Sequence, residues 1–431
     1  MGRGRVVIAL VPPLKEDQSV LKPNRRECMQ GALATMAAGA VFSFSGADPR
    51  PQREEKSGSK IESIETIALY PDSVVRVRTA EGIEGIGQVQ CPPLVCNAIV
   101  KNSEGLENIL RGEDPFEVDR LWQKMYNRTS LWGRRGVTIQ VIGAVETALW
   151  DIAGKILRKP VSELIWRPFA APGVESEIKS KVRPYTTVYP AGSTDEKTRR
   201  RLRVARDRGF RGIKFEEWPG GFGHGTVKQD VRCFQLAREA IGEDRDLFAD
   251  VQNAWTDVNH GIATSKAIEP LNVYLVEAPF APDNLEAYRR LADKVDVRIA
   301  AGDWGYTTRF DFLDLMERGG VDVVEPSTVE AGGISEIMNI AEMAWRRGRL
   351  CIPHSWNHMI GVSAAVHIAA VVPNMPYFEF PTEFPERPEV MELLVPSLRP
   401  DADGMIEVPK RPGLGFTLNE DIVKKYRRNL S

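Results

Sequence analysis

One repeating pattern governs the chain from about residue 183 to residue 380. A short run of β-branched or apolar residues is followed by a polar loop and then by a segment with apolar residues at helical spacing. The pattern predicts strands at 183–189, 212–216, 247–251, 274–280, 297–303, 321–326, 350–354 and 377–380. It predicts helices at 195–208, 227–241, 284–294, 309–318 and 334–347, among others. Strand followed by helix, repeated eight times, is typical of a closed parallel (β/α)8 barrel of the TIM type, within the α/β class.

Ionisable side chains stand at the carboxyl ends of seven consecutive predicted strands. In a barrel of this kind the catalytic groups lie at those ends, where the loops after the strands meet. The strand ends carry Lys214 with Glu216, Asp250, Glu277, Asp303, Glu325, His354 and Glu379. An unpaired ion in a low-dielectric interior is strongly penalised, so this many charges indicate cation binding or mutual pairing.

Three of these carboxylates have the spacing of a metal site. Asp250, Glu277 and Asp303 are 27 and 26 residues apart, which places them at equivalent depth on three neighbouring strands. Hard oxygen ligands without histidine or cysteine suit Mg²⁺, which keeps open positions for water or substrate oxygens. We therefore predict that these three residues bind Mg²⁺. Any one of them alone could instead cap a helix or pair with an arginine.

Lys214 and His354 are the predicted proton-transfer groups on the two sides of this metal site. A lysine that is desolvated near a divalent cation has its ammonium form disfavoured, which brings it into the range of a general base. His354 is suited to act as acid or base from the opposite side; the alternative is a core histidine without a catalytic role. Glu216 shares a strand face with Lys214 because residues i and i+2 point the same way.

The composition excludes several classes of partner. Lysine and arginine number 57 against 59 acidic residues, and the net charge of -2 gives no electrostatic reason to expect nucleic acid or an anionic membrane. Five cysteines without a Cys-x-x-Cys pair argue against a zinc ribbon or a disulfide framework. The expected partner is a small molecule bound in a pocket.

The segment 1–60 differs in composition from the rest of the chain. Arg25 and Arg26 precede an Ala- and Gly-rich stretch, which is followed by a segment rich in proline and charge. This order resembles a twin-arginine (Tat) signal peptide, and the apolar run is too short for a stable membrane span. We predict a signal segment at 1–47, a linker at 48–60, and an exported, periplasmic protein with no membrane association after processing. The alternative is an unprocessed tail on a cytoplasmic protein.

Four further motifs accompany the residues at the strand ends. They are EGIEGIG at 81–87, RGEDP at 111–115, ALWDIAGK at 148–155 and PGLG at 412–415. As a set, over about residues 61–418, they resemble the enolase superfamily and, within it, the mandelate racemase and muconate lactonizing enzyme branch. The resemblance implies an α+β capping domain at 61–182, the barrel at 183–390 and a C-terminal segment at 391–431 that returns to the capping domain. It also implies a homo-oligomer.

The shared step of that superfamily is removal of a proton next to a carboxylate, which gives an enediolate held by Mg²⁺. The resemblance implies that Asp250, Glu277 and Asp303 hold the metal and that Lys214 and His354 transfer protons. Glu379 would donate a hydrogen bond to a carboxylate oxygen of the substrate. That role requires a protonated Glu379, and therefore a pKa raised by burial or by a nearby anion.

Four positions depart from the family pattern, and the mildest change is Gln252, which replaces the usual asparagine after the third-strand ligand. Glu216 stands where the second lysine of a Lys-x-Lys pair is usual, and we expect it to pair with Lys214 or with a substrate hydroxyl. Asp303 is one methylene shorter than the usual glutamate. Ser327 stands where an aspartate usually pairs with the histidine of the seventh strand, and Glu325 lies one pleat deeper on the same side of that strand.

Sugar-acid dehydration fits this asymmetric set best. One base removes the α-proton and one acid protonates the departing β-hydroxyl, whereas two-base racemization needs a matched pair. We therefore expect an acid-sugar dehydratase (a lyase), with a racemase or epimerase (an isomerase) as the alternative and a barrel that binds an acid or sugar without catalysis as the second alternative. Additional substrate contacts are expected from Glu216, Ser327, Arg134, His224 and Trp356.

Overall fold

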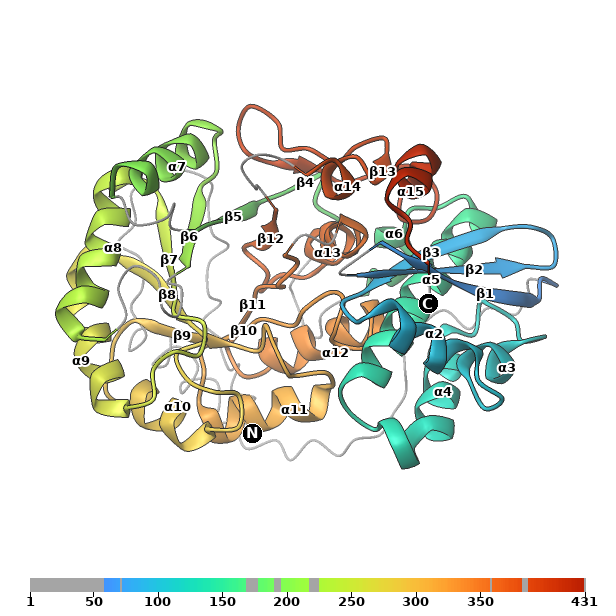
Figure 1. Ribbon diagram of the computed structural model, residues 1–431, viewed down its shortest axis with the longest axis horizontal. Coiled ribbons are helices and arrows are strands. Elements are labelled where there is room, and N and C mark those ends of the chain that lie inside the picture. Colours follow the sequence, from blue (N-terminus) through green and yellow to red (C-terminus); the bar gives the residue numbers. More distant parts are fainter. Residues whose placement is uncertain are drawn as a thin grey trace, which may run out of the picture.

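The computed structural model describes residues 58–69, 72–167, 177–189, 195–216, 225–356, 359–381 and 387–429. The predicted signal segment at 1–47 and nearly all of the predicted linker therefore lie outside the described residues. Two modules lie side by side in Figure 1, a barrel with a ring of helices and a smaller module built on a three-stranded sheet.

The smaller module is an antiparallel sheet covered by helices. Its sheet has the order β1 (Ile61–Ala68), β2 (Ser73–Thr79) and β3 (Glu84–Val89). Its helices are α2 (Pro93–Lys101), α3 (Leu106–Leu110), α4 (Val118–Gly133), α5 (Val137–Leu157) and α6 (Val161–Ile165). Apolar side chains from one sheet face and from α4 and α5 form a separate buried core. Among the described helices, α5 is long and apolar enough to cross a membrane, but 83% of its most apolar window is buried, which identifies it as a core helix.

The larger module is the predicted (β/α)8 barrel. Its strands are β5 (Pro184–Val188), β6 (Gly212–Glu216), β7 (Asp246–Asp250), β8 (Val273–Glu277), β9 (Arg298–Ala301), β10 (Val323–Val324), β11 (Leu350–Cys351) and β12 (Phe378–Phe380). All neighbours pair in parallel, in the order β11-β10-β9-β8-β7-β6-β5-β12. The backbone N–H of Glu379 donates to the carbonyl of Pro353 at 3.0 Å and so links the two ends of the sheet. The predicted fold class is confirmed.

Helices follow the strands and cover the outside of the barrel (Figure 1). They are α7 (Asp195–Asp207), α8 (Val227–Ile241), α9 (Val258–Ile268), α10 (Leu285–Ala292), α11 (Arg309–Asp314), α12 (Ile334–Trp345) and α13 (Met359–Val371), with a 3-10 turn (Glu269–Leu271) after α9 and a π-helical turn (Leu315–Gly319) after α11. The largest apolar core lies between these helices and the outward side chains of the strands.

The inside of the barrel changes from apolar to charged within one pleat. A cluster of buried, mostly apolar residues fills the lower layer: Tyr185, Phe248, Leu275, Ala300, Val323, Ile352 and Tyr377. Two positions further along these strands, where alternation returns the side chain to the same side, the residues are Thr187, Asp250, Glu277, Gly302, Glu325, His354 and Glu379. Lys214 joins this layer from β6. The apolar layer therefore forms the floor beneath the charged groups that the sequence places at the strand ends.

The last part of the chain contacts both modules. It comprises α14 (Pro388–Met391), β13 (Leu394–Val395), β14 (Ile406–Glu407), β15 (Thr417–Leu418) and α15 (Glu420–Tyr426), with β14 paired to β4 (Lys181–Val182) and β13 to β15. The backbone N–H of Leu414 donates to Asp151 on α5 at 2.9 Å, and Arg427 forms an ion pair with Glu65 on β1 at 2.9 Å. This segment thus tethers the small module to the barrel.

Helix α5 forms one of the contacts between the modules. Its Glu146 accepts hydrogen bonds from the backbone N–H groups of Ile334 and Ser335 at 2.7 and 2.9 Å, so a carboxylate of one module caps helix α12 of the other. Gly143 lets the two backbones meet, because a Cβ there would lie 2.6 Å from the backbone nitrogen of Gly333. The small module is therefore fixed against the loop that follows β10.

Candidate active site

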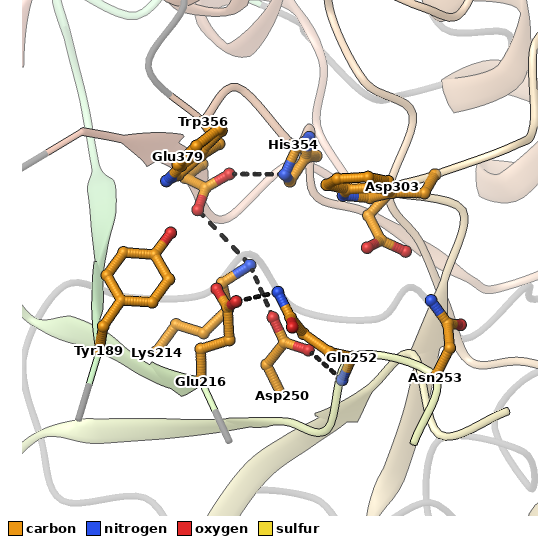
Figure 2. Close-up of a pocket in the computed structure, with 11 residues that line it drawn as sticks. Tyr189, Lys214, Glu216, Asp250, Gln252, Asn253, Asp303, His354, Trp356 and Glu379 are labelled. Atoms are coloured by element: carbon orange, nitrogen blue, oxygen red, sulfur yellow. Dashed lines mark hydrogen bonds and ion pairs between the residues drawn. The ribbon is translucent and has the colours of Figure 1, made fainter. Parts of the chain in front are cut away.

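A pocket opens at the carboxyl ends of the barrel strands. Its volume is about 210 Å³. The lining side chains come from strand ends far apart in the sequence, and Figure 2 shows them directed toward a common space. They are Tyr189, Lys214, Glu216, Asp250, Gln252, Asn253, Asp303, Trp304, His354, Trp356 and Glu379. The structure therefore brings together most of the residues that the sequence singles out.

Lys214 lies at the centre of this group. Its Nζ is 2.8 Å from Glu277 Oε1, 3.2 Å from Asp250 Oδ2 and 3.4 Å from Glu379 Oε1, and its side chain is almost completely buried. Burial favours the neutral amine, but the charges of Glu277 and Glu379 outweigh it and raise the pKa of Lys214 well above its ordinary value. These contacts favour the ammonium form of Lys214, which is the opposite direction from the expected neutral base.

Glu379 lies between the two predicted proton-transfer groups. Its Oε1 faces Lys214 and accepts a hydrogen bond from the hydroxyl of Thr187, while its Oε2 lies 3.4 Å from His354 Nε2 and accepts from the backbone N–H of Ser355 at 3.1 Å. Burial alone would raise the pKa of Glu379, but Lys214, His354 and these hydrogen bonds lower it to about 2. Its neighbours therefore favour the anion, which is the opposite direction from the expected protonated Glu379.

Glu379 also supplies the carboxylate that the sequence leaves unassigned for His354. A carboxylate beside a proton-transferring histidine is the usual means of orienting its ring. In the sequence this partner is expected from the sixth strand, where Ser327 stands instead of an aspartate. Here it comes from β12, which closes the barrel against the end of β11. Figure 2 shows the Glu379 carboxylate beside His354.

The three predicted metal ligands lie on adjacent strand ends and are all buried. Burial raises the pKa of Asp250, Glu277 and Asp303, to about 7 for Asp303, and in Glu277 and Asp303 the charge of Asp250 adds to the shift. Within the described residues, Glu277 Oε2 has no hydrogen-bond partner. Buried carboxylates raise one another's pKa, and a hard divalent cation would stabilise their charged forms. The unpartnered oxygen of Glu277 is available as a ligand. The residues present therefore fit Mg²⁺.

In this structure, the carboxylates are not arranged in a coordination geometry for a metal ion. Over the part of the chain that the structure describes, no group of three or more His, Cys, Asp or Glu side chains is arranged to hold a metal ion. The Lys214 ammonium contacts Asp250 and Glu277 directly, so it supplies the positive charge at this point. Cation binding at these ligands would therefore require Lys214 to give up some of these contacts.

A glycine directs Asp303 into the pocket. Ala300 faces the barrel interior, so strict alternation would turn residue 303 outward. Gly302 has a φ of +115°, and a Cβ at this position would collide with the ring of Phe312. This turn ends the regular strand and brings the Asp303 carboxylate back to the other ligands.

Glu216 and Gln252 form a separate pair at the edge of the pocket. The side-chain amide of Gln252 donates to Glu216 Oε1. Burial, and after it the charge of Asp250, raises the pKa of Glu216 to about 9. We expected Glu216 to pair with Lys214 or with a substrate hydroxyl. Among the described residues, Lys214 forms ion pairs with Asp250, Glu277 and Glu379, whereas Glu216 contacts Gln252.

The other predicted substrate contacts have different outcomes. Trp356 lines the pocket, whereas Ser327 is fully buried and is not among its described lining residues. Arg134 is exposed at the end of α4 and does not reach the pocket; its neighbour Arg135 forms an ion pair with Asp311 on α11 at 2.7 Å. His224 lies outside the described residues.

Four lining residues were not predicted as pocket residues from the sequence: Tyr189, Gln252, Asn253 and Trp304. Tyr189 continues the inward alternation of Tyr185 and Thr187, which is a signal that the sequence contains. Asn253 and Trp304 depend on the course of the chain after β7 and β9, and Asn253 has a left-handed φ of 60°. No local pattern in the sequence indicates that these two side chains face the pocket.

Comparisons with known proteins agree with this architecture. Residues 58–166 match the mandelate racemase / muconate lactonizing enzyme N-terminal domain, and residues 197–422 match the enolase C-terminal domain-like family. The chain is 32% identical over 372 residues to the arabinonate dehydratase of Saccharolobus solfataricus, which covers 85% of this chain and 93% of that protein. It is 28% identical over 369 residues to the D-galactarolactone cycloisomerase of Agrobacterium fabrum, which covers 82% and 90%.

A solved structure shares the whole fold. The 3,6-anhydro-D-galactonate cycloisomerase from Zobellia galactanivorans has a TM-score of 0.76 and 26% sequence identity, and the match covers 86% of this chain and all of that chain. The resemblance seen in the motifs is thereby confirmed. The chain is an enzyme of the enolase superfamily and belongs to its mandelate racemase and muconate lactonizing enzyme branch.

Proposed function

We propose that this enzyme dehydrates a sugar acid to a 2-keto-3-deoxy acid, with Mg²⁺ as its cofactor. The bond between the α-carbon and its proton breaks, the β-hydroxyl leaves as water, and the resulting enol rearranges to the keto acid. The observation that carries the proposal is the pocket in which Asp250, Glu277 and Asp303 lie beside Lys214 and His354. The similarity to an arabinonate dehydratase supports a sugar acid as the substrate class.

Asp250, Glu277 and Asp303 are the residues that would hold the metal. A bound Mg²⁺ stabilises negative charge on the carboxylate oxygens of a substrate more in the transition state than in the ground state. The high density of buried carboxylates supports this assignment, because burial raises the pKa of each and a bound cation would stabilise their charged forms.

Lys214 and His354 are the groups that move protons. One of them removes the α-proton and the other protonates the departing hydroxyl. Glu379 contacts both, one carboxylate oxygen to each, and so fixes them relative to one another. The two groups differ in chemistry and in partners, because Lys214 contacts three carboxylates whereas His354 contacts Glu379. This asymmetry is consistent with dehydration, in which the two groups have different tasks, and the similarity to an arabinonate dehydratase favours it over racemization.

The pocket wall offers polar and aromatic contacts that suit a hydroxylated chain. Glu216, Gln252 and Asn253 can hydrogen-bond to substrate hydroxyls, while Trp356 offers an indole surface to the carbon chain. A volume of about 210 Å³ corresponds to a small ligand. A short-chain aldonic or aldaric acid matches these features.

The test is a panel of aldonic and aldaric acids, including D- and L-arabinonate, incubated with the purified enzyme and Mg²⁺ in D₂O. Formation of a 2-keto-3-deoxy acid, abolished by a chelator and restored by Mg²⁺, is the expected result. A Lys214→Ala and a His354→Ala variant then identify the base, since loss of the base abolishes exchange of the α-proton with deuterium.

The alternatives give distinct results in the same experiment. Exchange of the α-proton with inversion and without a keto acid would identify a racemase or epimerase and reject dehydration. Saturable binding of a sugar acid with neither exchange nor product would reject that acid as the substrate.

A further inference from the structure

Glu325 is a buried carboxylate that the proposed reaction leaves without a role. It follows β10, in which Val323 faces the barrel interior and pairs in register with Ala300 of β9. Glu277 of β8 pairs with the same residue, Ala300, so Val323 and Glu277 occupy equivalent register positions on either side of β9. Alternation turns Glu325 into the barrel one pleat above Val323. Its side chain is completely buried.

The carboxylate of Glu325 has no partner of its own. Among the described residues, neither of its oxygens accepts a hydrogen bond, and Oε2 of Glu277 likewise accepts none. The other carboxylates at the strand ends that point into the barrel are better placed. Asp250, Glu277 and Glu379 each lie within 3.4 Å of the Lys214 ammonium. In the described parts of the chain, no cationic side chain forms an ion pair with Glu325 or with Asp303.

The unpartnered oxygens belong to one neighbourhood. Burial, and after it the charge of Glu325, raises the pKa of Glu277 well above its ordinary value, and the charge of Asp303 does the same, after burial, for Glu325. Burying an unpaired carboxylate costs several kcal/mol. An uncharged residue of similar size would avoid this cost, so the position is suited to a cation-binding side chain.

We propose that Glu325 binds the divalent cation together with Glu277 and Asp303, as a fourth carboxylate of the metal site. The inference rests on the proposed metal site and adds to it a residue from the sixth strand of the barrel. A further anionic oxygen neutralises more of the cation's charge and fills a position otherwise taken by water, so it strengthens binding of hard divalent ions such as Mg²⁺ and Mn²⁺.

The test is a titration of the metal-free enzyme with Mn²⁺. Binding is measured as the decrease in the electron paramagnetic resonance signal of free Mn²⁺. Glu325→Gln keeps the shape of the side chain and removes its charge. It is expected to weaken Mn²⁺ binding by about tenfold or more. Ser327→Ala is the matched control, because this neighbouring side chain is equally buried, has an unpartnered hydroxyl among the described residues and carries no charge. It should leave Mn²⁺ affinity unchanged.

Folding of the metal-free variants is measured in parallel by thermal unfolding. Glu325→Gln removes an uncompensated charge, so its metal-free midpoint should equal or exceed that of the unsubstituted enzyme, and its shift on adding Mn²⁺ should be smaller. A lower metal-free midpoint would overturn the proposal, because the charge would then already have a partner.

The measured Mn²⁺ affinities distinguish failure of the role of Glu325 from failure of the proposed metal site. If the unsubstituted enzyme binds Mn²⁺ and Glu325→Gln binds it equally well, the role of Glu325 is overturned while the proposed metal site stands. If the unsubstituted enzyme binds no Mn²⁺, the metal site of the proposed function fails, and the role of Glu325 fails with it.

Discussion

His367 makes the junction between the two modules sensitive to acid. It lies in α13 of the barrel and is completely buried. Its Nδ1 accepts a hydrogen bond from the backbone N–H of Ser162 at 3.2 Å, and its Nε2 lies 3.1 Å from the carbonyl of Leu414, to which it donates. The neutral ring therefore satisfies one group of the small module and one of the C-terminal segment. A second proton, on Nδ1, would face the N–H of Ser162.

The pKa of His367 determines how much of the free energy of unfolding is lost at acid pH. Burial lowers this pKa from 6.5 to about 4, although the carbonyl of Leu414 acts in the opposite direction. Because the unfolded chain binds the proton more readily, the stabilising contribution is complete above pH 6.5 and is lost as the pH falls toward 4. At about 1.4 kcal/mol per pH unit, the full loss is about 3 kcal/mol, of which about 2 kcal/mol has gone at pH 5.

His367→Gln is the appropriate perturbation, since an amide can accept from Ser162 and donate to Leu414 without titrating. Urea unfolding of both proteins between pH 7.5 and pH 4 measures the free energy of unfolding. Other titrating groups cancel in the difference between the two proteins. We expect the variant to gain about 2 kcal/mol relative to the native protein between pH 7.5 and pH 5. Parallel pH curves for the two proteins would refute the reasoning.

Three further substitutions test the site and the junction. Lys214→Met leaves buried carboxylates unpaired and should lower the metal-free free energy of unfolding by about 3–5 kcal/mol, measured in urea. Glu379→Gln removes the anion that contacts Lys214 and His354 and should lower kcat by about 100-fold with little change in substrate affinity, measured by keto-acid formation. Gly143→Ala forces a Cβ against the backbone of Gly333 and should cost about 1–3 kcal/mol in thermal unfolding.

The sequence by itself determined the barrel and the composition of its charged layer. Strand alternation and helical spacing are local properties, so the eight-strand repeat could be read without knowing any long-range contact. The predicted helix at 227–241 agrees with α8, and the strand at 212–216 with β6. The same alternation turned Asp250, Glu277 and Glu325 inward, because each follows an inward residue by two positions.

Tertiary structure alone decided the pKa shifts and the pairing of those groups. The pKa of Glu379 is lowered because Lys214 and His354 reach it from other strands, and the pKa of Lys214 is raised because carboxylates from β7, β8 and β12 surround it. Arg134 and Arg135 are adjacent in the sequence, yet one is exposed and the other pairs with Asp311 across the module junction. A pKa or an ion pair depends on distances across the barrel, which local sequence patterns do not contain.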